Sequence, residues 1–183
     1  MKEALVNLVK KGNIRRLKTI LDAGADINGT DWQGHTALIK AASKRNKEML
    51  LLLLEYGADV NIRTPKYHYT ALLELLYPSK WGPAITEQRA VDMTRALLEK
   101  GADVNAADCE GDTALMYATR QGWIEVVRLL LEHGADINMK NRSKDTALNC
   151  TYGRLEIEKL LQSYAAKMKP PLQQGNREKE DAG

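Results

Sequence analysis

The residues of this 183-residue chain that could carry out chemistry are few, and their spacing forms no recognisable catalytic set. No two of the histidines, His35, His68 and His133, stand at metal-ligand spacing, and Cys109 and Cys150 form no Cys-x-x-Cys pair. No glycine-rich loop follows a strand pattern, as a phosphate-binding loop would require. We therefore expect no enzyme activity, no metal site and no cofactor.

One alternative places weak catalysis near His68, with Glu74 or Glu87 as its acid–base partner. A general acid–base pair needs side chains within hydrogen-bond reach of a common substrate atom. No spacing in the sequence indicates that these residues meet, so the alternative has no positive support.

Composition narrows the class of protein further. Apolar residues make up 44% of the chain and charged residues 28%, which is typical of a soluble domain. The longest apolar run, 49–54, is far shorter than the roughly 20 residues of a membrane-spanning helix, and the first residues lack a secretory pattern. The net charge of +3 gives no broad attraction to nucleic acid. We expect a cytoplasmic protein with reduced thiols that binds neither membranes nor nucleic acid.

Two recurring strings indicate which elements hold the polar and aromatic side chains. The string Gly-Ala-Asp-Ile/Val-Asn recurs in steps of 33, 44 and 33 residues, and the string Thr-Ala-Leu in steps of 34, 43 and 33. Their first residues are Gly24, Gly57, Gly101 and Gly134, and Thr36, Thr70, Thr113 and Thr146. The long second step places an insertion of ten residues in the third unit, between Thr70 and Gly101. Such self-similarity is the signature of a repeat architecture.

Each repeat reads as two short helices. The Thr before Ala-Leu is a good helix N-cap, because its hydroxyl can accept a hydrogen bond from a first-turn N–H. The pattern predicts a first helix over 37–44 and second helices over 47–55 and 124–132, the latter two rich in Leu and Val. Gly57 and Gly134 then stand where a helix ends in a left-handed residue, before the chain turns into a short hairpin.

Two helices this short cannot bury their apolar faces alone, so we expect the units to stack into a solenoid. The fifth unit has a shortened first helix and a polar second helix, as a C-terminal cap would. The expected units are 2–28, 31–61, 64–105 with the insertion at 78–88, 108–138 and 141–165, and they make one domain, 1–165, followed by a disordered tail, 166–183.

The period of 33, the Asp-x-x-Gly-x-Thr-x-Leu opening at Asp31 and Asp108, and the Gly-Ala-Asp-Val-Asn close resemble the ankyrin repeat. The resemblance implies an all-α fold, an α-solenoid of about five stacked helix-turn-helix repeats joined by short β-hairpins. Two departures stand out. The family's Thr-Pro-Leu-His motif lacks its His in every copy, and Arg45 replaces the usual linker Gly, so we expect Arg45 to adopt that left-handed turn.

The resemblance also implies function. Ankyrin arrays are protein-binding scaffolds, so we expect a non-enzymatic, monomeric interaction module with another protein as its partner. In the family, binding uses the hairpin tips and the exposed side of the first helices. The corresponding positions here are Trp32, Gln33, His35, Ser43, Lys44, Lys66, Tyr67, Tyr69, Cys109, Glu110, Asp112, Arg120 and Gln121.

Aromatic residues among these positions suggest anchors for the partner, since Trp and Tyr are enriched at binding hot spots. Our hypothesis is that Trp32, Tyr67 and Tyr69 form one patch; the alternative is that Trp32 packs flat on the neighbouring hairpin. The insertion 78–88 offers Trp81, which either binds a partner or folds back over helix ends, and Thr86 is expected to cap the helix that follows.

A second function remains open. In the ankyrin family the hairpin Asn can be the target of a hydroxylase, and Asn61 or Asn105 would match that position. The chain would then be a modified substrate or regulatory subunit. The sequence also leaves open whether a bacterial array of this kind acts in its own cytoplasm or in that of a host cell.

Overall fold

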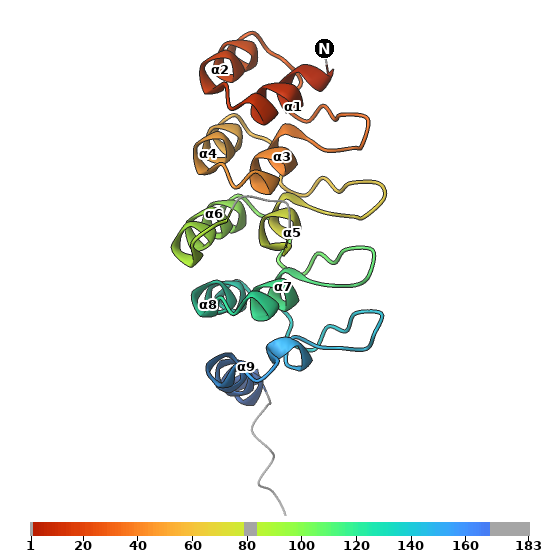
Figure 1. Ribbon diagram of the computed structural model, residues 1–183, viewed down its shortest axis with the longest axis vertical. Coiled ribbons are helices and arrows are strands. Elements are labelled where there is room, and N and C mark those ends of the chain that lie inside the picture. Colours follow the sequence, from red (N-terminus) through yellow and green to blue (C-terminus); the bar gives the residue numbers. More distant parts are fainter. Residues whose placement is uncertain (1, 79–83, 169–183) are drawn as a thin grey trace, which may run out of the picture.

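The chain folds into pairs of short helices stacked one above another (Figure 1), which confirms the predicted all-helical repeat solenoid. The computed structural model describes residues 2–78 and 84–168. Its helices are α1 (Lys2–Lys11), α2 (Ile14–Asp22), α3 (Ala37–Ser43), α4 (Lys47–Glu55), α5 (Ala71–Leu76), α6 (Glu87–Glu99), α7 (Ala114–Gln121), α8 (Ile124–Glu132), the 3-10 helix η1 (Asn149–Thr151) and α9 (Leu155–Met168). We call α1, α3, α5 and α7 the first helices and α2, α4, α6, α8 and α9 the second helices.

The predicted caps begin three of the first helices. The hydroxyls of Thr36, Thr70 and Thr113 accept hydrogen bonds from the backbone N–H three residues on, at 3.1, 3.3 and 3.3 Å. Asn13 and Asn46 cap α2 and α4 in the same way. Each cap satisfies one of the N–H groups that the first helical turn leaves without a partner, so the repeated Thr and Asn fix where each helix begins.

The core runs continuously through the stack. Ile39 on α3, Leu53 on α4 and Leu73 on α5 are almost completely buried. The helix α3 contacts α1 on one side and α5 on the other, and α6 lies between α4 and α8. No helix pair has a core of its own, so each tier depends on its neighbours for burial, as the short helices predict.

The hairpins that project from the first helices are minimal (Figure 1). Single antiparallel bridges join Thr30 to Thr36 and Ala107 to Thr113, and within the described residues no longer strand forms. Two of the predicted β-hairpins are therefore loops closed by a single bridge each. Gly34, at φ +78°, lies so close to the next hairpin that a Cβ there would stand 2.2 Å from Cδ of Pro65.

Asparagine side chains connect one tier to the next. The side-chain oxygens of Asn28, Asn61 and Asn105 accept the backbone N–H of Asp59, Asp103 and Asp136, at 2.9, 2.8 and 2.8 Å. The amides of Asn61 and Asn105 also donate to the carbonyl oxygens of Gly101 and Gly134. The recurring Asn is thus an inter-repeat tie, which we call the Asn ladder.

Two tiers depart from the common pattern. In the third, α5 has six residues and α6 has 13, and Thr86 caps α6 by accepting from the N–H of Arg89 at 3.4 Å, as predicted. In the fifth, the 3-10 helix η1 replaces a first α-helix, and α9 reaches Met168. Arg45 adopts the expected left-handed turn, with φ 52°.

Some predictions fall outside the described residues. Trp81 and most of the insertion's tip lie in 79–83, and nearly all of the expected tail lies in 169–183. Of the helices that the structure describes, none combines the length and apolarity needed to cross a bilayer.

Candidate protein-binding face

One surface of the stack carries the side chains that stand four and seven residues after each capping Thr. Lys40 and Ser43 on α3, Glu74 and Tyr77 around α5, and Tyr117 and Arg120 on α7 occupy these positions. Positions four and seven lie on one side of a helix. Together with the hairpins 30–36, 64–69 and 107–113 they form a surface that we call the inner face.

Buried carboxylates shape the hairpins that border the inner face. One oxygen of Asp31 accepts the N–H groups of Gln33 and His35, both at 3.0 Å, and the other lies 3.4 Å from the amine of Lys10. Burial raises the pKa of Asp31, but the backbone donors of His35 and Gln33 outweigh it, and the net direction is down. Asp31 therefore stays ionised and holds its loop in one shape.

Asp108 holds the hairpin of the fourth tier in the same way that Asp31 holds the hairpin of the second. Asp108 accepts the N–H groups of Glu110 and Asp112, at 2.8 and 2.9 Å. Its second oxygen accepts a hydrogen bond from the hydroxyl of Tyr117. The two loops share one geometry because a carboxylate stands at the same repeat position in each, and its hydrogen bonds hold the hairpin tip in a fixed shape.

Four tyrosines form a continuous row across the inner face. The ring centroids of Tyr67 and Tyr69 lie 5.7 Å apart, those of Tyr69 and Tyr77 5.3 Å, and those of Tyr77 and Tyr117 5.5 Å. Tyr67 is 46% exposed and Tyr77 37%, whereas Tyr117 is buried. We call this set the tyrosine row. It links the third hairpin to α7.

Burial keeps the inner phenols of the row neutral. Burial and the hydrogen bond to Asp108 raise the pKa of Tyr117, and burial with the neighbouring Tyr77 raises that of Tyr69. Neutral phenols offer an apolar ring together with a hydroxyl that can donate or accept. The row can therefore pack against apolar side chains of a partner.

Cations flank the row at both ends. The amine of Lys66 lies 4.8 Å from the ring centre of Tyr67, and the guanidinium of Arg120 lies 5.8 Å from that of Tyr117. Arg120 also makes a two-pronged ion pair with Asp112, at 2.5 and 2.8 Å. This pair raises the pKa of Arg120, so the guanidinium is held in place as well as charged.

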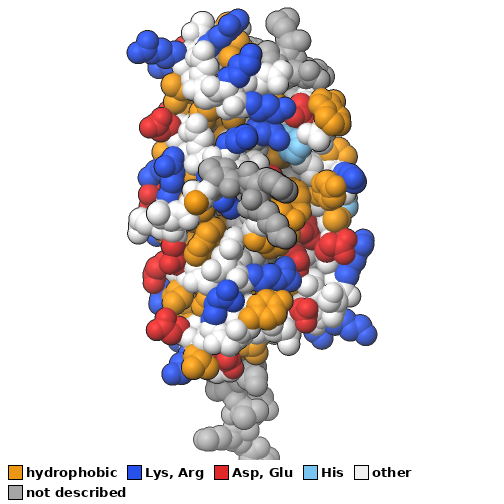
Figure 2. Space-filling view, in the orientation of Figure 1, with side chains coloured by type: hydrophobic (Ala, Val, Ile, Leu, Met, Phe, Trp, Pro, Cys, Tyr) orange, Lys and Arg blue, Asp and Glu red, His pale blue; other side chains and the backbone are white. Residues whose placement is uncertain are grey.

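A second group of cations lies at the α1–α3 end of the inner face. Figure 2 shows several Lys and Arg side chains there, and apolar side chains on the upper part of the hairpin side, above a mixture of acidic and basic ones. Lys40 is half-buried, and it lies near Lys10 and Lys44 as well as Asp31 and Glu74. Within the described part of the chain, its amine has no hydrogen bond and no ion pair.

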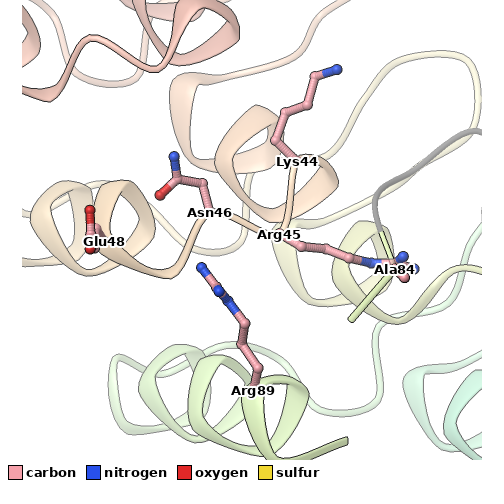
Figure 3. Close-up of a pocket in the computed structure, with 6 residues that line it drawn as sticks. All are labelled: Lys44, Arg45, Asn46, Glu48, Ala84 and Arg89. Carbon is pink, nitrogen blue, oxygen red and sulfur yellow. The ribbon is translucent and has the colours of Figure 1, made fainter. Parts of the chain in front are cut away.

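A cavity of about 360 Å³ extends this positive surface toward the linker between α3 and α4. In Figure 3 Arg89 points from α6 toward Asn46, and Arg45 reaches across to Ala84. Lys44 and Glu48 complete its lining. With three cations and one carboxylate, the cavity favours anionic groups.

The structure brings some of the predicted binding residues together. Tyr67 and Tyr69 stack, and Lys66 covers Tyr67. Trp32 is 81% exposed on the preceding hairpin, and among the described rings it contacts neither tyrosine. The hypothesis of a single patch of Trp32, Tyr67 and Tyr69 therefore divides into a tyrosine row and a separate exposed indole.

The remaining predicted positions lie along the same hairpins and helices. His35 is half-buried against Asp31 at 3.2 Å, and Gln33 and Lys44 are exposed. Glu110 is exposed and pairs with Arg142 at 3.4 Å. Gln121 ends α7, half-buried, and Trp81 lies outside the described residues.

Sequence reasoning missed Tyr77, Tyr117 and Lys40. A usable signal was present, because all three stand four or seven residues after a capping Thr and so share a helix face with Ser43 and Arg120, which were considered. The resemblance favoured hairpin tips and the last residues of the first helices, and it passed over Lys40 and Tyr117 within α3 and α7 and Tyr77 just after α5.

Catalytic groupings receive no support from the geometry of the described residues. No cluster of three His, Cys, Asp or Glu side chains that could hold a metal ion occurs in 2–78 and 84–168. His68 is exposed on the third hairpin with φ 58°, and in this part of the chain no hydrogen bond or ion pair joins it to Glu74 or Glu87.

Comparison with known proteins identifies the family of this chain. A family model described as ankyrin repeats (3 copies) matches residues 2–74 and 84–171. The chain belongs to the ankyrin-repeat family, whose arrays are generally protein-interaction modules and typically non-catalytic.

Curated relatives carry the same repeats within longer proteins. The chain is 35% identical over 116 residues to mouse ankyrin repeat and SOCS box protein 6, covering 63% of this chain and 26% of that protein. It is 32% identical over 120 residues to mouse ankyrin repeat, SAM and basic leucine zipper domain-containing protein 1, covering 66% and 24%. The chain thus spans about a quarter of the length of these relatives.

Proposed function

We propose that this chain is a non-enzymatic, monomeric scaffold that binds another protein through its inner face. The tyrosine row is the observation that carries the proposal. Two of its members, Tyr67 and Tyr77, leave much of their rings exposed. Tyr77 is held between the rings of Tyr69 and Tyr117, and Tyr67 stacks on Tyr69 beside the amine of Lys66. Exposed aromatic rings that are already ordered lose little entropy on binding, so each contact contributes more affinity.

The surroundings of the row support the same function. Carboxylates hold the neighbouring hairpins, and the Arg120–Asp112 pair fixes the far end of the row. The predicted positions Trp32, Lys66 and Glu110 would add contacts at the rim. Both cysteines are free thiols, which fits work in a reducing compartment such as the cytoplasm.

The test compares variants of exposed tyrosines. Replacing Tyr67 and Tyr77 together by Ala removes the accessible part of the row, and Tyr152→Ala is the matched control, because Tyr152 is 72% exposed but lies outside the row. Each immobilised chain is incubated with an extract of its source cells, and bound proteins are quantified by mass spectrometry. We expect at least one protein captured equally by wild type and Tyr152→Ala and reduced about tenfold or more by the double variant.

Thermal unfolding serves as the control for folding. The double variant should melt within a few degrees of wild type, since both rings are partly solvated. Equal capture by all three chains would contradict the proposed use of the row.

No feature of Asn61 or Asn105 favours the hydroxylase alternative over scaffold function. Both side-chain amides are engaged in the Asn ladder.

A further inference from the structure

Among the described residues, the α1–α3 end of the inner face has more cations than carboxylates. Lys10, Lys40 and Lys44 converge there from α1 and α3. The nearest carboxylate, Asp31, already accepts hydrogen bonds from the backbone of its own loop and from Lys10. Within the described residues it makes no direct ion pair with Lys40.

Lys40 is the group with the clearest need of a partner. Its amine is half-buried, and among the described residues no acceptor lies within hydrogen-bond or ion-pair distance. Burial lowers its pKa, Asp31 and Glu74 act in the opposite direction, and the like charges of Lys10 and Lys44 lower it further. A partly desolvated ammonium without a carboxylate in direct contact costs stability, and a carboxylate from outside would relieve that cost.

Tyr77, an inner member of the tyrosine row, lies next to this positive end. Glu74 on α5 and Tyr77, which follows α5, share one side of that helix, and α5 packs directly against α3. Along the inner face a ligand would therefore meet cations first and then a row of aromatic rings. An anionic group followed by an apolar one is the complementary order.

We propose that the inner face takes an extended acidic segment of a partner protein, with one carboxylate on Lys40 and an apolar side chain on the tyrosine row. This inference rests on the proposed function and specifies the chemistry of its partner. A single-stranded nucleic acid also combines negative charge with stacking bases. It fits less well, because Glu74 lies on the same face near Lys40 and would repel a continuous phosphate backbone, whereas a peptide can present an uncharged residue there.

The test is a selection with the full chain as bait. Short random peptides displayed on phage are selected for binding, and labelled oligouridine is titrated in parallel. We expect the selected peptides to be enriched in Asp and Glu together with Leu or aromatic residues. Their binding should weaken with added salt, because charge pairs at a protein surface are screened.

Variants locate the binding site of the selected peptides. Lys40→Gln should lower their affinity about tenfold or more, in line with the loss of a charge-assisted hydrogen bond, while leaving the fold intact because it removes an unpaired charge. Lys100→Gln is the matched control, since Lys100 is an exposed lysine that ends α6, away from the inner face. Tyr77→Ala should also weaken binding.

Four results would overturn the inference. Selected peptides that are neutral or basic, yet sensitive to Tyr77→Ala, would refute the acidic segment and leave the proposed function standing. Acidic peptides insensitive to Lys40→Gln would refute the assigned contact. Failure to select any peptide, or tighter Lys40-dependent binding of oligouridine, would refute a peptide ligand, and the capture experiment with Tyr67 and Tyr77 would still decide the scaffold function.

Discussion

Removal of one member of the Asn ladder should weaken the stack between two tiers. Asn61 accepts the N–H of Asp103 at 2.8 Å and donates to the carbonyl oxygen of Gly101 at 3.0 Å. Asn61→Ala removes both hydrogen bonds. A typical net contribution is about 0.5–1.5 kcal/mol for each bond. Because Asn61 is exposed, water can replace the lost partners. The expected loss is therefore in the lower half of the summed range, ~1–2 kcal/mol.

The assay is urea and thermal unfolding of the full chain, followed by circular dichroism. A loss of this size should lower the melting temperature by ~3–6 °C for a chain of this length. Asn105→Ala should behave in the same way, because its side chain makes the equivalent bonds to Asp136 and Gly134, at 2.8 and 3.2 Å.

Asn138 supplies the matched control. It closes the same Gly-Ala-Asp-Ile-Asn motif, but among the described residues its side chain makes no hydrogen bond to a following tier. Asn138→Ala should leave stability almost unchanged. Equal destabilisation by Asn138→Ala and Asn61→Ala would show that the motif Asn acts within its own loop, and the inter-repeat reasoning would be refuted.

Two further changes probe the hairpins. Gly34→Ala should lower the unfolding free energy by at least ~2 kcal/mol, because the added Cβ would clash with Pro65. Gly57 has a similar positive φ but open space around it, so Gly57→Ala should cost only ~1 kcal/mol. Parallel urea titrations of the two variants measure the difference. Burial raises the pKa of Asp112, but the hydrogen bonds from Arg120 and Asn141 outweigh burial and hold this pKa below 3.8 in the folded chain. The ionised carboxylate therefore stabilises the fold above pH 3.8, and this stabilisation is lost as the pH falls through the lower pKa of the folded state. Acid unfolding should therefore be less steep in Asp112→Asn than in wild type.

The repeat period and helix positions could be predicted because they depend on local rules. A Thr before Ala-Leu caps a helix wherever it stands, and a Leu-rich helix of nine residues must be covered by neighbours. The second helices α4 and α8 accordingly begin and end at the predicted residues, 47–55 and 124–132.

The departures were harder to predict, since they depend on which of several possible hydrogen bonds a polar side chain makes. The first helix of the fifth unit is reduced to the 3-10 turn η1, in which Asn149 accepts hydrogen bonds from Thr146 instead of leaving Thr146 to cap a helix. The hairpins are closed by single bridges because carboxylate–backbone hydrogen bonds from Asp31 and Asp108 already satisfy their N–H groups.

The candidate site illustrates the same limit. Sequence spacing places Tyr69 on a hairpin and Tyr117 in a helix of the next repeat, 48 positions away, and only stacking of the tiers brings them into one row through Tyr77. The backbone of a repeat array is regular, whereas its surface chemistry is determined by side chains that differ from tier to tier. The binding surface of such a molecule therefore depends on how one repeat position varies from tier to tier. In this chain the position four residues after the capping Thr is occupied by Lys40, Glu74 and Tyr117 in turn, and this variation makes one end of the inner face charged and the other aromatic.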